Sequence, residues 1–238
     1  MLNLYKTHLH ILQLEEYSPL RFLNWWFRHP FTASISNKKP LVYTQKIRHL
    51  ILLSHISLII LLILFARFQI LDSIFLLFYL LSPFVYLFLA ILAYKPHELI
   101  NRQLTINKVR KQILTHPHLT TIGITGSYGK TGTKNFLFDI LNNFLPSLKT
   151  PESYNTVFGI AKTINLELTD NLHYFISEMG AYKIGEINEL CRMTPPNYAI
   201  LTAIGTQHLE RFKNLKNTTE AKFELINHTP PSHALVNL

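Results

Sequence analysis

The chain has 238 residues, of which 48% are hydrophobic and 16% charged. An average soluble domain carries about 25% charged residues, so part of this chain is not expected to face water. A single cysteine, Cys191, excludes an internal disulfide and a zinc site built from four cysteines. The net charge of +9 suits a nucleic acid, an anionic membrane surface or a phosphate-bearing ligand, and the placement of the charges has to decide among them.

The first segment, residues 1–46, is basic and rich in aromatic residues. Trp25 and Trp26 lie between Arg21 and Arg28, a pattern typical of an amphipathic helix at the level of lipid headgroups. A small soluble cap that packs on the later domain is the alternative for this segment.

The second segment, residues 47–94, holds two apolar runs, 50–66 and 70–93, separated by a short turn that contains Arg67. Together the runs are about twice the length needed for one bilayer crossing, which predicts two transmembrane helices in a hairpin. The alternative is a buried helical pair in a soluble core.

The basic residues on both sides of this hairpin predict a protein of the cytoplasmic membrane, in contact with lipid and with both termini in the cytoplasm. They also account for much of the net charge, so no nucleic-acid partner is expected. A polar, basic linker helix is expected over residues 95–113.

A phosphate-binding loop is predicted after this linker. The β-branched run 119–125 indicates a strand, Gly126-Ser127-Tyr128-Gly129-Lys130-Thr131-Gly132 follows it, and a helical pattern comes next. In this context the loop backbone would surround phosphate oxygens of ATP, Lys130 would reach the outer phosphates, and Thr131 would offer a hydroxyl to Mg²⁺. The usual loop has four residues between its glycines, whereas this one has two.

The shortened loop resembles that of the Mur ligase family, the ATP-dependent, amide-forming enzymes of peptidoglycan precursor synthesis. Four further segments resemble the same family in the same order, and the second of them is similar to the branch that adds a dipeptide. The four, in chain order, are Thr150-Pro151 through Asn155, Glu178-Met-Gly180 with Gly185-Glu186-Ile187, the strand with His208, and Ala221-Lys222.

This resemblance implies roles for particular residues. Glu178, expected at the end of a strand, would coordinate Mg²⁺, a cation that prefers oxygen ligands. His208 and Lys222, the latter carbamylated by CO₂, would hold a second Mg²⁺ and take part in catalysis. Asn155 would lie near phosphate or substrate, although a loop of this composition is often only a turn.

The expected fold is therefore α/β, with a Mur-ligase-type P-loop domain of mostly parallel sheet over residues 114–238, preceded by two transmembrane helices. The implied activity is a ligase reaction through an acyl phosphate, with ATP, a cell-wall precursor or other carboxylate, and an amino acid or dipeptide amine as partners. The alternatives are a membrane-tethered nucleotide-binding or scaffold protein without ligase activity, and a folylpolyglutamate synthetase-like ligase.

Two departures from the family pattern accompany this expectation. The place of the usual UDP-sugar-binding domain is taken by the predicted hairpin, and the chain stops before the residues that would contact adenine and the amine. A fragment that is inactive on its own is therefore expected.

Overall fold

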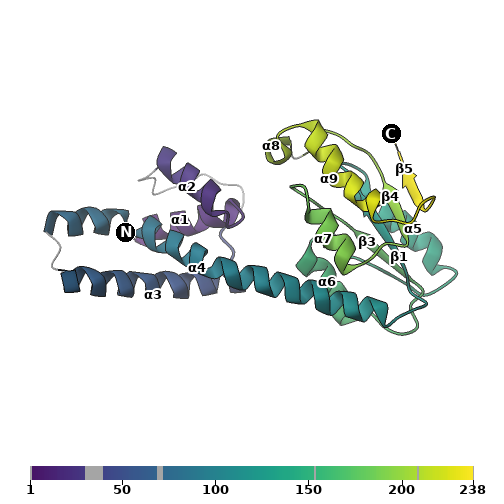
Figure 1. The fold of residues 1–238 in the computed structure, drawn as a ribbon, viewed down its shortest axis with the longest axis horizontal. Helices are drawn as coiled ribbons and strands as arrows, with labels where there is room; N and C mark the ends of the chain where they lie inside the picture. The colour runs from purple at the N-terminus through teal and green to yellow at the C-terminus, as the bar shows by residue number, and fades with distance from the viewer. Residues whose placement is uncertain (1, 30–39, 69–71, 153, 208, 238) are drawn as a thin grey trace. The chain divides into compact units, whose positions relative to one another are not determined.

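The chain forms two compact units, residues 1–100 and residues 101–238 (Figure 1). The computed structural model describes residues 2–29, 40–68, 72–152, 154–207 and 209–237.

Unit 1 is helical and consists of α1 (Leu2–Leu14), α2 (Pro19–Arg28), α3 (Gln45–Phe68) and the first part of α4 (Asp72–Leu114). Local signals in the sequence account for two of the helix starts. The side chain of Ser18 accepts a hydrogen bond from Arg21 N, and Pro19 occupies the first turn of α2, where its missing N–H has no cost. The hydroxyl of Thr44 accepts from Ile47 N at the start of α3, at 3.3 Å.

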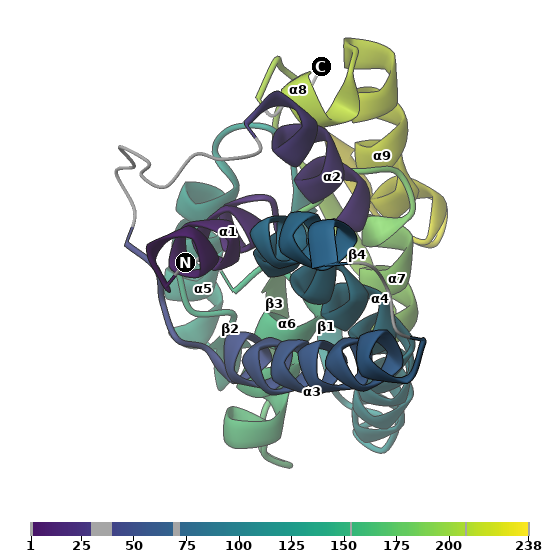
Figure 2. The ribbon, with the colours of Figure 1, turned by 90° about the vertical axis from the view of Figure 1, so that its left-hand side faces the viewer.

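The core of unit 1 joins all four helices. Figures 1 and 2 both show α2 on the side of α4 away from α3, and α1 contacts α3 through the hydrogen bond between Tyr5 and Ser54. Each helix contributes apolar side chains that are almost completely buried: Leu9 and Leu12 from α1, Phe22 from α2, Ile47 and Leu50 from α3, and Phe84, Leu87 and Ile91 from α4. Part of the aromatic N-terminal segment thus packs into this core, with the ring of Trp26 stacked on Phe84 at 4.3 Å between centroids.

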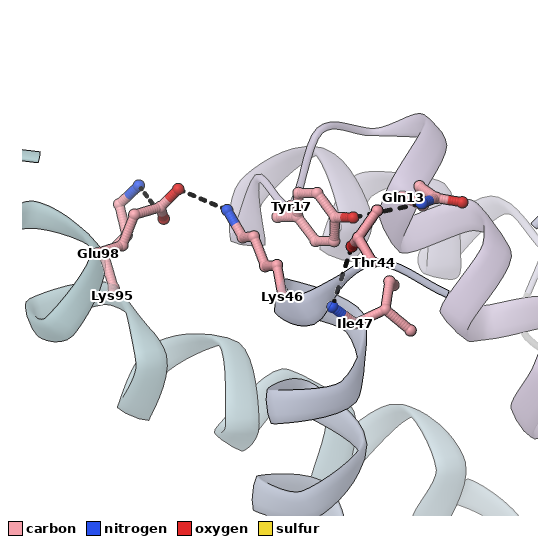
Figure 3. A network of polar contacts seen from close by, with 7 residues as sticks. All are labelled: Gln13, Tyr17, Thr44, Lys46, Ile47, Lys95 and Glu98. Carbon is pink, nitrogen blue, oxygen red and sulfur yellow. Dashed lines mark hydrogen bonds and ion pairs between the residues drawn. The ribbon is translucent and has the colours of Figure 1, made fainter. Parts of the chain in front are cut away.

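Polar contacts at one end of unit 1 connect the start of α3 with α1 and α4 (Figure 3). Lys46 forms an ion pair with Glu98, whose second carboxylate oxygen lies 3.3 Å from Lys95 Nζ. The Lys46 ammonium also lies 4.2 Å from the centre of the Tyr17 ring. These partly exposed pairs add specificity to the arrangement more than stability.

The prediction of two transmembrane helices, and with it the placement in the cytoplasmic membrane as a two-span protein, is wrong. Within the described residues one helix, Gln45–Leu64, is long and apolar enough to cross a membrane, rather than two. Part of the second apolar run has another physical role, because several of its described side chains, among them Tyr86 and Ala90, are buried against the other helices of unit 1. The run also contains Pro83, inside α4.

Unit 2 is an α/β unit. Its elements after α4 are β1 (Thr120–Thr125), α5 (Lys130–Asn142), β2 (Ser147–Lys149), α6 (Val157–Glu167), β3 (Tyr174–Glu178), α7 (Glu186–Met193), β4 (Tyr198–Leu201), α8 (Leu209–Phe212), α9 (Leu215–Asn227) and β5 (Ala234–Val236). The strands form one sheet in the order β2-β3-β1-β4-β5, and every neighbouring pair is parallel. The predicted α/β fold with a parallel sheet is confirmed.

Helices cover both faces of this sheet. On one face Ile122, Ile124 and Ile176 pack with apolar residues of α5. On the other face Phe175 packs with residues of α6, α7 and α9, including Leu225. Because side chains alternate along a strand, neighbouring residues such as Phe175 and Ile176 of β3 belong to the cores on opposite faces of the sheet. All carboxyl ends of the strands lie at one edge of the sheet, where the loop between β1 and α5 begins.

The last turns of α4 belong to the core of unit 2. Ile106, Val109 and Ile113, spaced three and four residues apart, are at most 6% exposed and pack into the same core as α6 and α7. Arg102 Nε donates to Glu189 of α7 at 2.7 Å. The helical residues 101–114 are therefore structural members of the α/β unit.

Candidate functional site

The loop between β1 and α5 has a backbone conformation that requires glycine at its first position. Gly126 has φ of 152°, and a Cβ there would lie 2.0 Å from the hydroxyl oxygen of Thr202. Gly129 has φ of 83° and immediately precedes α5. The loop therefore turns sharply and delivers the N-terminal N–H groups of α5 to the carboxyl edge of the sheet, which is a favourable place for an anion.

Hydrogen bonds connect this loop to the segment that follows β4. Ser127 N donates to Ala203 O at 2.7 Å, and the Ser127 hydroxyl accepts from Gly205 N at 3.0 Å. The Thr202 hydroxyl donates to Tyr128 O at 2.6 Å. The ring of Tyr128 lies so close to Gly205 that a Cβ at that position would come within 2.6 Å of it. The two loops thus form one connected structure.

Lys130, the first residue of α5, turns back towards the loop. Its ammonium donates to Gly126 O at 2.7 Å and to Ser127 O at 3.3 Å. Burial lowers the pKa of Lys130, and the negative charge of Glu178 opposes that shift. The ammonium is therefore held at the loop, within electrostatic reach of Glu178.

Glu178, at the end of β3, is the centre of a buried polar cluster and is 2% exposed. Its Oε2 accepts from the Thr131 hydroxyl at 2.9 Å and from Lys134 Nζ at 3.1 Å. Its Oε1 accepts from Asn155 Nδ2 at 3.4 Å. The structure therefore brings together Thr131, Glu178 and Asn155, three of the residues that sequence analysis predicts for the site.

Sequence analysis missed Lys134, which lies in the middle of this cluster. A helical lysine is usually solvated, and nothing in its type indicates burial. The available signal was its spacing, because residues three positions apart lie on the same side of a helix, and Lys134 is three residues after Thr131.

The Thr-Pro segment, residues 150–155, packs beside Glu178. The buried Thr150 hydroxyl accepts from Glu178 N at 3.0 Å, which gives this side chain a structural contact to the backbone. Asn155 O accepts from Gly180 N at 2.9 Å, and a Cβ at Gly180 would come within 2.7 Å of the Asn155 side chain. Glycine at 180 thus makes room for Asn155 next to the carboxylate of Glu178.

Lys222, in α9, is 3% exposed. Burial and the positive charge of Lys130 lower the pKa of Lys222 to about 8, while the carboxylates of Glu186 and Glu224 act in the opposite direction. The electrostatic effect of Lys130 indicates that the two lysines belong to one region of unit 2. Loss of the Lys222 proton is therefore easier than for an exposed lysine.

Glu224, two residues further along α9, was also missed. It is 8% exposed, and its carboxylate accepts hydrogen bonds from Gly185 N and, at 2.8 Å, from Asn188 N. These N–H groups lie at the start of α7, where a negative charge is favourable. Glu224 thereby fixes the Ala-Lys segment, residues 221–222, to the Gly-Glu-Ile segment, residues 185–187, two of the motifs that carry the family resemblance.

His208 and Gly132 are the two further residues that sequence analysis predicts for the site. His208 lies outside the described residues. Gly132, in the first turn of α5, is exposed, and a Cβ there would meet no atom within 4 Å. Its position therefore imposes no need for glycine. Among the residues that the structure describes, no three His, Cys, Asp or Glu side chains are grouped as a metal site.

Comparison with known proteins assigns a family to this half of the chain. Residues 124–238 match the Mur ligase middle domain. UDP-N-acetylmuramoyl-tripeptide–D-alanyl-D-alanine ligase of Synechocystis is 38% identical over 117 residues, which are 49% of this chain and 26% of that protein. The enzyme of the same name from Bacillus subtilis is 33% identical over 122 residues, 51% of this chain and 26% of that protein.

Solved structures give the same result. MurF from Acinetobacter baumannii has a TM-score of 0.54 at 32% identity and covers 57% of this chain and 30% of its own. MurF ligase from Thermotoga maritima in complex with ADP also has a TM-score of 0.54 at 32% identity, and the match covers 57% and 31%. The chain spans about a quarter of the length of the curated relatives that it matches.

Proposed function

Because residues 124–238 form a Mur ligase middle domain, we propose that the chain provides the nucleotide site of an ATP-dependent ligase of peptidoglycan precursor synthesis. The proposed reaction forms an amide between a muramoyl-peptide carboxylate and an amine such as D-alanyl-D-alanine, the compounds in the names of the relatives. The observation that carries the proposal is the convergence of the glycine loop, Thr131 and buried Glu178 at one sheet edge.

The glycine loop and the start of α5 are the proposed phosphate site. The loop N–H groups and the positive end of the α5 dipole favour phosphate oxygens. Lys130 would exchange its bonds to Gly126 O and Ser127 O for the outer phosphates of ATP, which requires a rotation of its side chain. Residues 126–132 together form this proposed cradle.

The donors beside this site fit Mg²⁺. Thr131 and Glu178 present a hydroxyl and a carboxylate, which are the oxygen ligands that the ion prefers. When bound there, the ion would neutralise charge on the phosphates as the acyl phosphate forms. Asn155 would hold the Glu178 carboxylate in place through its contact with Oε1.

Lys222 and His208 are the proposed ligands of a second Mg²⁺. A neutral amine is needed for attack on CO₂, which gives a carbamate anion and releases one proton. Burial and the lowered pKa of Lys222, to about 8, support this modification, because they provide that neutral amine. The assignment of His208 rests on the family resemblance of its motif.

The proposed reaction has two steps. The carboxylate of the precursor attacks the γ-phosphorus of ATP, so that an acyl phosphate forms and ADP leaves. The amine then attacks the acyl carbon, the amide forms and inorganic phosphate departs. The protein's part is to position the reactants and to stabilise charge, which supplies most of the catalysis in phosphoryl transfer.

The test is Lys222→Ala in the longest form of the protein that the gene encodes. Ligation of UDP-N-acetylmuramoyl-tripeptide to D-alanyl-D-alanine should fall by roughly a hundredfold or more, while ATP binding measured by calorimetry stays within about threefold. Added short carboxylates should restore part of the rate, because they can replace the carbamate. Lys216→Ala, at an exposed position of the same helix, is the matched control.

Two results would contradict the proposal. A parental ligation rate in Lys222→Ala would remove this lysine from catalysis. ATP binding without ligation of any such precursor in the parent would favour a nucleotide-binding protein without ligase activity. Ligation of a folate-type acceptor would instead favour the folylpolyglutamate synthetase-like alternative.

A further inference from the structure

Lys134 is a buried cation that neither the sequence motifs nor the proposed reaction explains. It is 1% exposed, and its ion pair with Glu178 is buried on both sides. Its ammonium also donates to Glu152 O at 2.6 Å. Burial of a lysine is costly unless its charge is compensated, and here Glu178 and the Glu152 carbonyl provide that compensation.

The two carboxylate oxygens of Glu178 differ in the number and length of their hydrogen bonds. Oε2 accepts from both Lys134 and Thr131, at 3.1 and 2.9 Å. Oε1 accepts only the longer bond from Asn155 Nδ2, at 3.4 Å, among the contacts of the described residues. Oε2 therefore has two shorter hydrogen bonds, and Oε1 has one longer hydrogen bond.

The second contact of Lys134 is with Glu152, whose backbone has an unfavourable conformation. Glu152 has φ of 30°, a value that side-chain-bearing residues rarely adopt. The Lys134 ammonium holds the carbonyl of this residue, in the same segment as Asn155. Lys134 thus connects α5, the end of β3 and the Thr-Pro segment at one point.

We propose that Lys134 is a positioning residue that fixes Glu178 as a one-oxygen metal ligand and holds the Thr-Pro segment beside it. Lys134 Nζ and the Thr131 hydroxyl both hold Oε2, so the carboxylate is oriented before a metal arrives. Oε1 then remains as the oxygen for the ion. This inference rests on the proposed nucleotide and Mg²⁺ site, but its test uses no ligation.

The test is Lys134→Met in the whole chain, which removes the charge and keeps much of the side-chain volume. In EDTA the unfolding midpoint of unit 2, followed by circular dichroism, should fall by roughly 10 °C, because Glu178 is left as a buried, uncompensated anion. Millimolar Mg²⁺ without nucleotide should restore at least half of this loss in Lys134→Met and shift the parent by less than a quarter of it. In this variant the Mg²⁺ ion would supply the positive charge that Lys134 provides in the parent.

The matched control is Lys162→Met. Lys162 also contacts the Thr-Pro segment, through the Tyr154 hydroxyl at 3.1 Å, but it is exposed and does not touch Glu178. Its midpoint should change little, with or without Mg²⁺.

A second variant covers the case in which Lys134→Met does not fold. Lys134→Met combined with Glu178→Gln removes both charges, and it should be folded and should not respond to Mg²⁺. The proposal is overturned if Lys134→Met matches Lys162→Met, or if neither Mg²⁺ nor Glu178→Gln reverses its loss. A parent that does not bind MgATP would contradict the proposed function instead, and the coupling between Lys134 and Glu178 would be measured all the same.

Discussion

The histidine at position 8 has an unusual environment for a titratable side chain. His8 is 1% exposed in α1, and neither ring nitrogen has a hydrogen-bond partner among the described residues. Its ring lies edge-on to Phe22 and Trp25, at 6.1 and 5.7 Å between centroids. Burial among these apolar rings lowers the pKa of His8 to about 4.

This shift predicts that acid destabilises unit 1. The unfolded chain takes up the His8 proton near pH 6.5, whereas the folded chain resists it until about pH 4, so the unfolded state binds more protons between these values. The free energy of unfolding should therefore fall as the pH drops through this window, by about 3 kcal/mol in total. Fluorescence of Trp25 and Trp26, the two tryptophans of the chain, reports the unfolding of this unit.

The comparison for this prediction is His8→Phe, which removes the titrating group and keeps a ring of similar size. The difference in unfolding free energy between parent and variant should change with pH only between about 4 and 6.5. His49→Phe, at an exposed position in α3, should keep the pH dependence of the parent. A pH-independent difference for His8→Phe would show that His8 is not the responsible group.

The site residues differ in how far the sequence could predict them. Lys130 and Thr131 follow from a local motif, because the strand, glycines and helix are contiguous. Lys134 and Glu224 could not be predicted from their types, since a charged residue in a helix is normally solvated. Their burial depends on partners distant in the sequence, Glu178 for Lys134 and the start of α7 for Glu224.

At the scale of elements, two glycines of the phosphate loop have opposite requirements. Gly126→Ala should destabilise unit 2 by roughly 2–4 kcal/mol, because the new Cβ would collide with Thr202 and φ lies where alanine is strained. Gly132→Ala should be neutral or stabilise by up to about 1 kcal/mol, because the position is helical and open. Urea unfolding without nucleotide, followed by circular dichroism, measures both.

Because Gly126 and Gly132 lie in the same segment, Gly132→Ala is the control for Gly126→Ala. Equal losses for both would mean that the contact between the loop and the segment after β4 does not constrain Gly126. A loss confined to Gly126→Ala would support the close approach of the two loops as a stabilising contact.

The elements of unit 2 follow the sequence patterns closely. The strand expected over 119–125 is β1, and the apolar run that ends at Glu178 is β3. The apolar runs of unit 1 could not be interpreted in this way, because a protein interior and a lipid interior select the same side chains. The packing of Phe84, Leu87 and Ile91 against other helices places this part of the second run in a protein interior.

At the scale of the whole molecule, the two units should respond differently to nucleotide. A ligand stabilises the part of the fold that binds it, so MgATP should raise the unfolding midpoint of unit 2, measured by circular dichroism. At a free concentration a hundredfold above its Kd the gain is about 2.7 kcal/mol. Lys130→Ala should abolish most of this rise, because the ammonium is the proposed partner of the outer phosphates.

Adenosine and tryptophan fluorescence provide the controls. Adenosine lacks phosphates and should act equally on parent and Lys130→Ala. The transition reported by Trp25 and Trp26 should not move with MgATP if unit 1 unfolds by itself. A nucleotide-dependent shift in that fluorescence would mean that the chain unfolds as one cooperative body, and an undiminished rise in Lys130→Ala would contradict the phosphate-site assignment.

The shared helix α4 has a consequence for anyone who wishes to excise the nucleotide-binding half as a recombinant piece. The division between the units falls after residue 100, inside a continuous helix, and not in a loop. A piece that started after Leu114 would lose Ile106, Val109 and Ile113, each worth roughly 1.5–3 kcal/mol when buried. That loss is comparable with the whole stability of a typical domain. The excised piece should therefore begin near Asn101, so that the end of α4 still covers the apolar surface of α6 and α7.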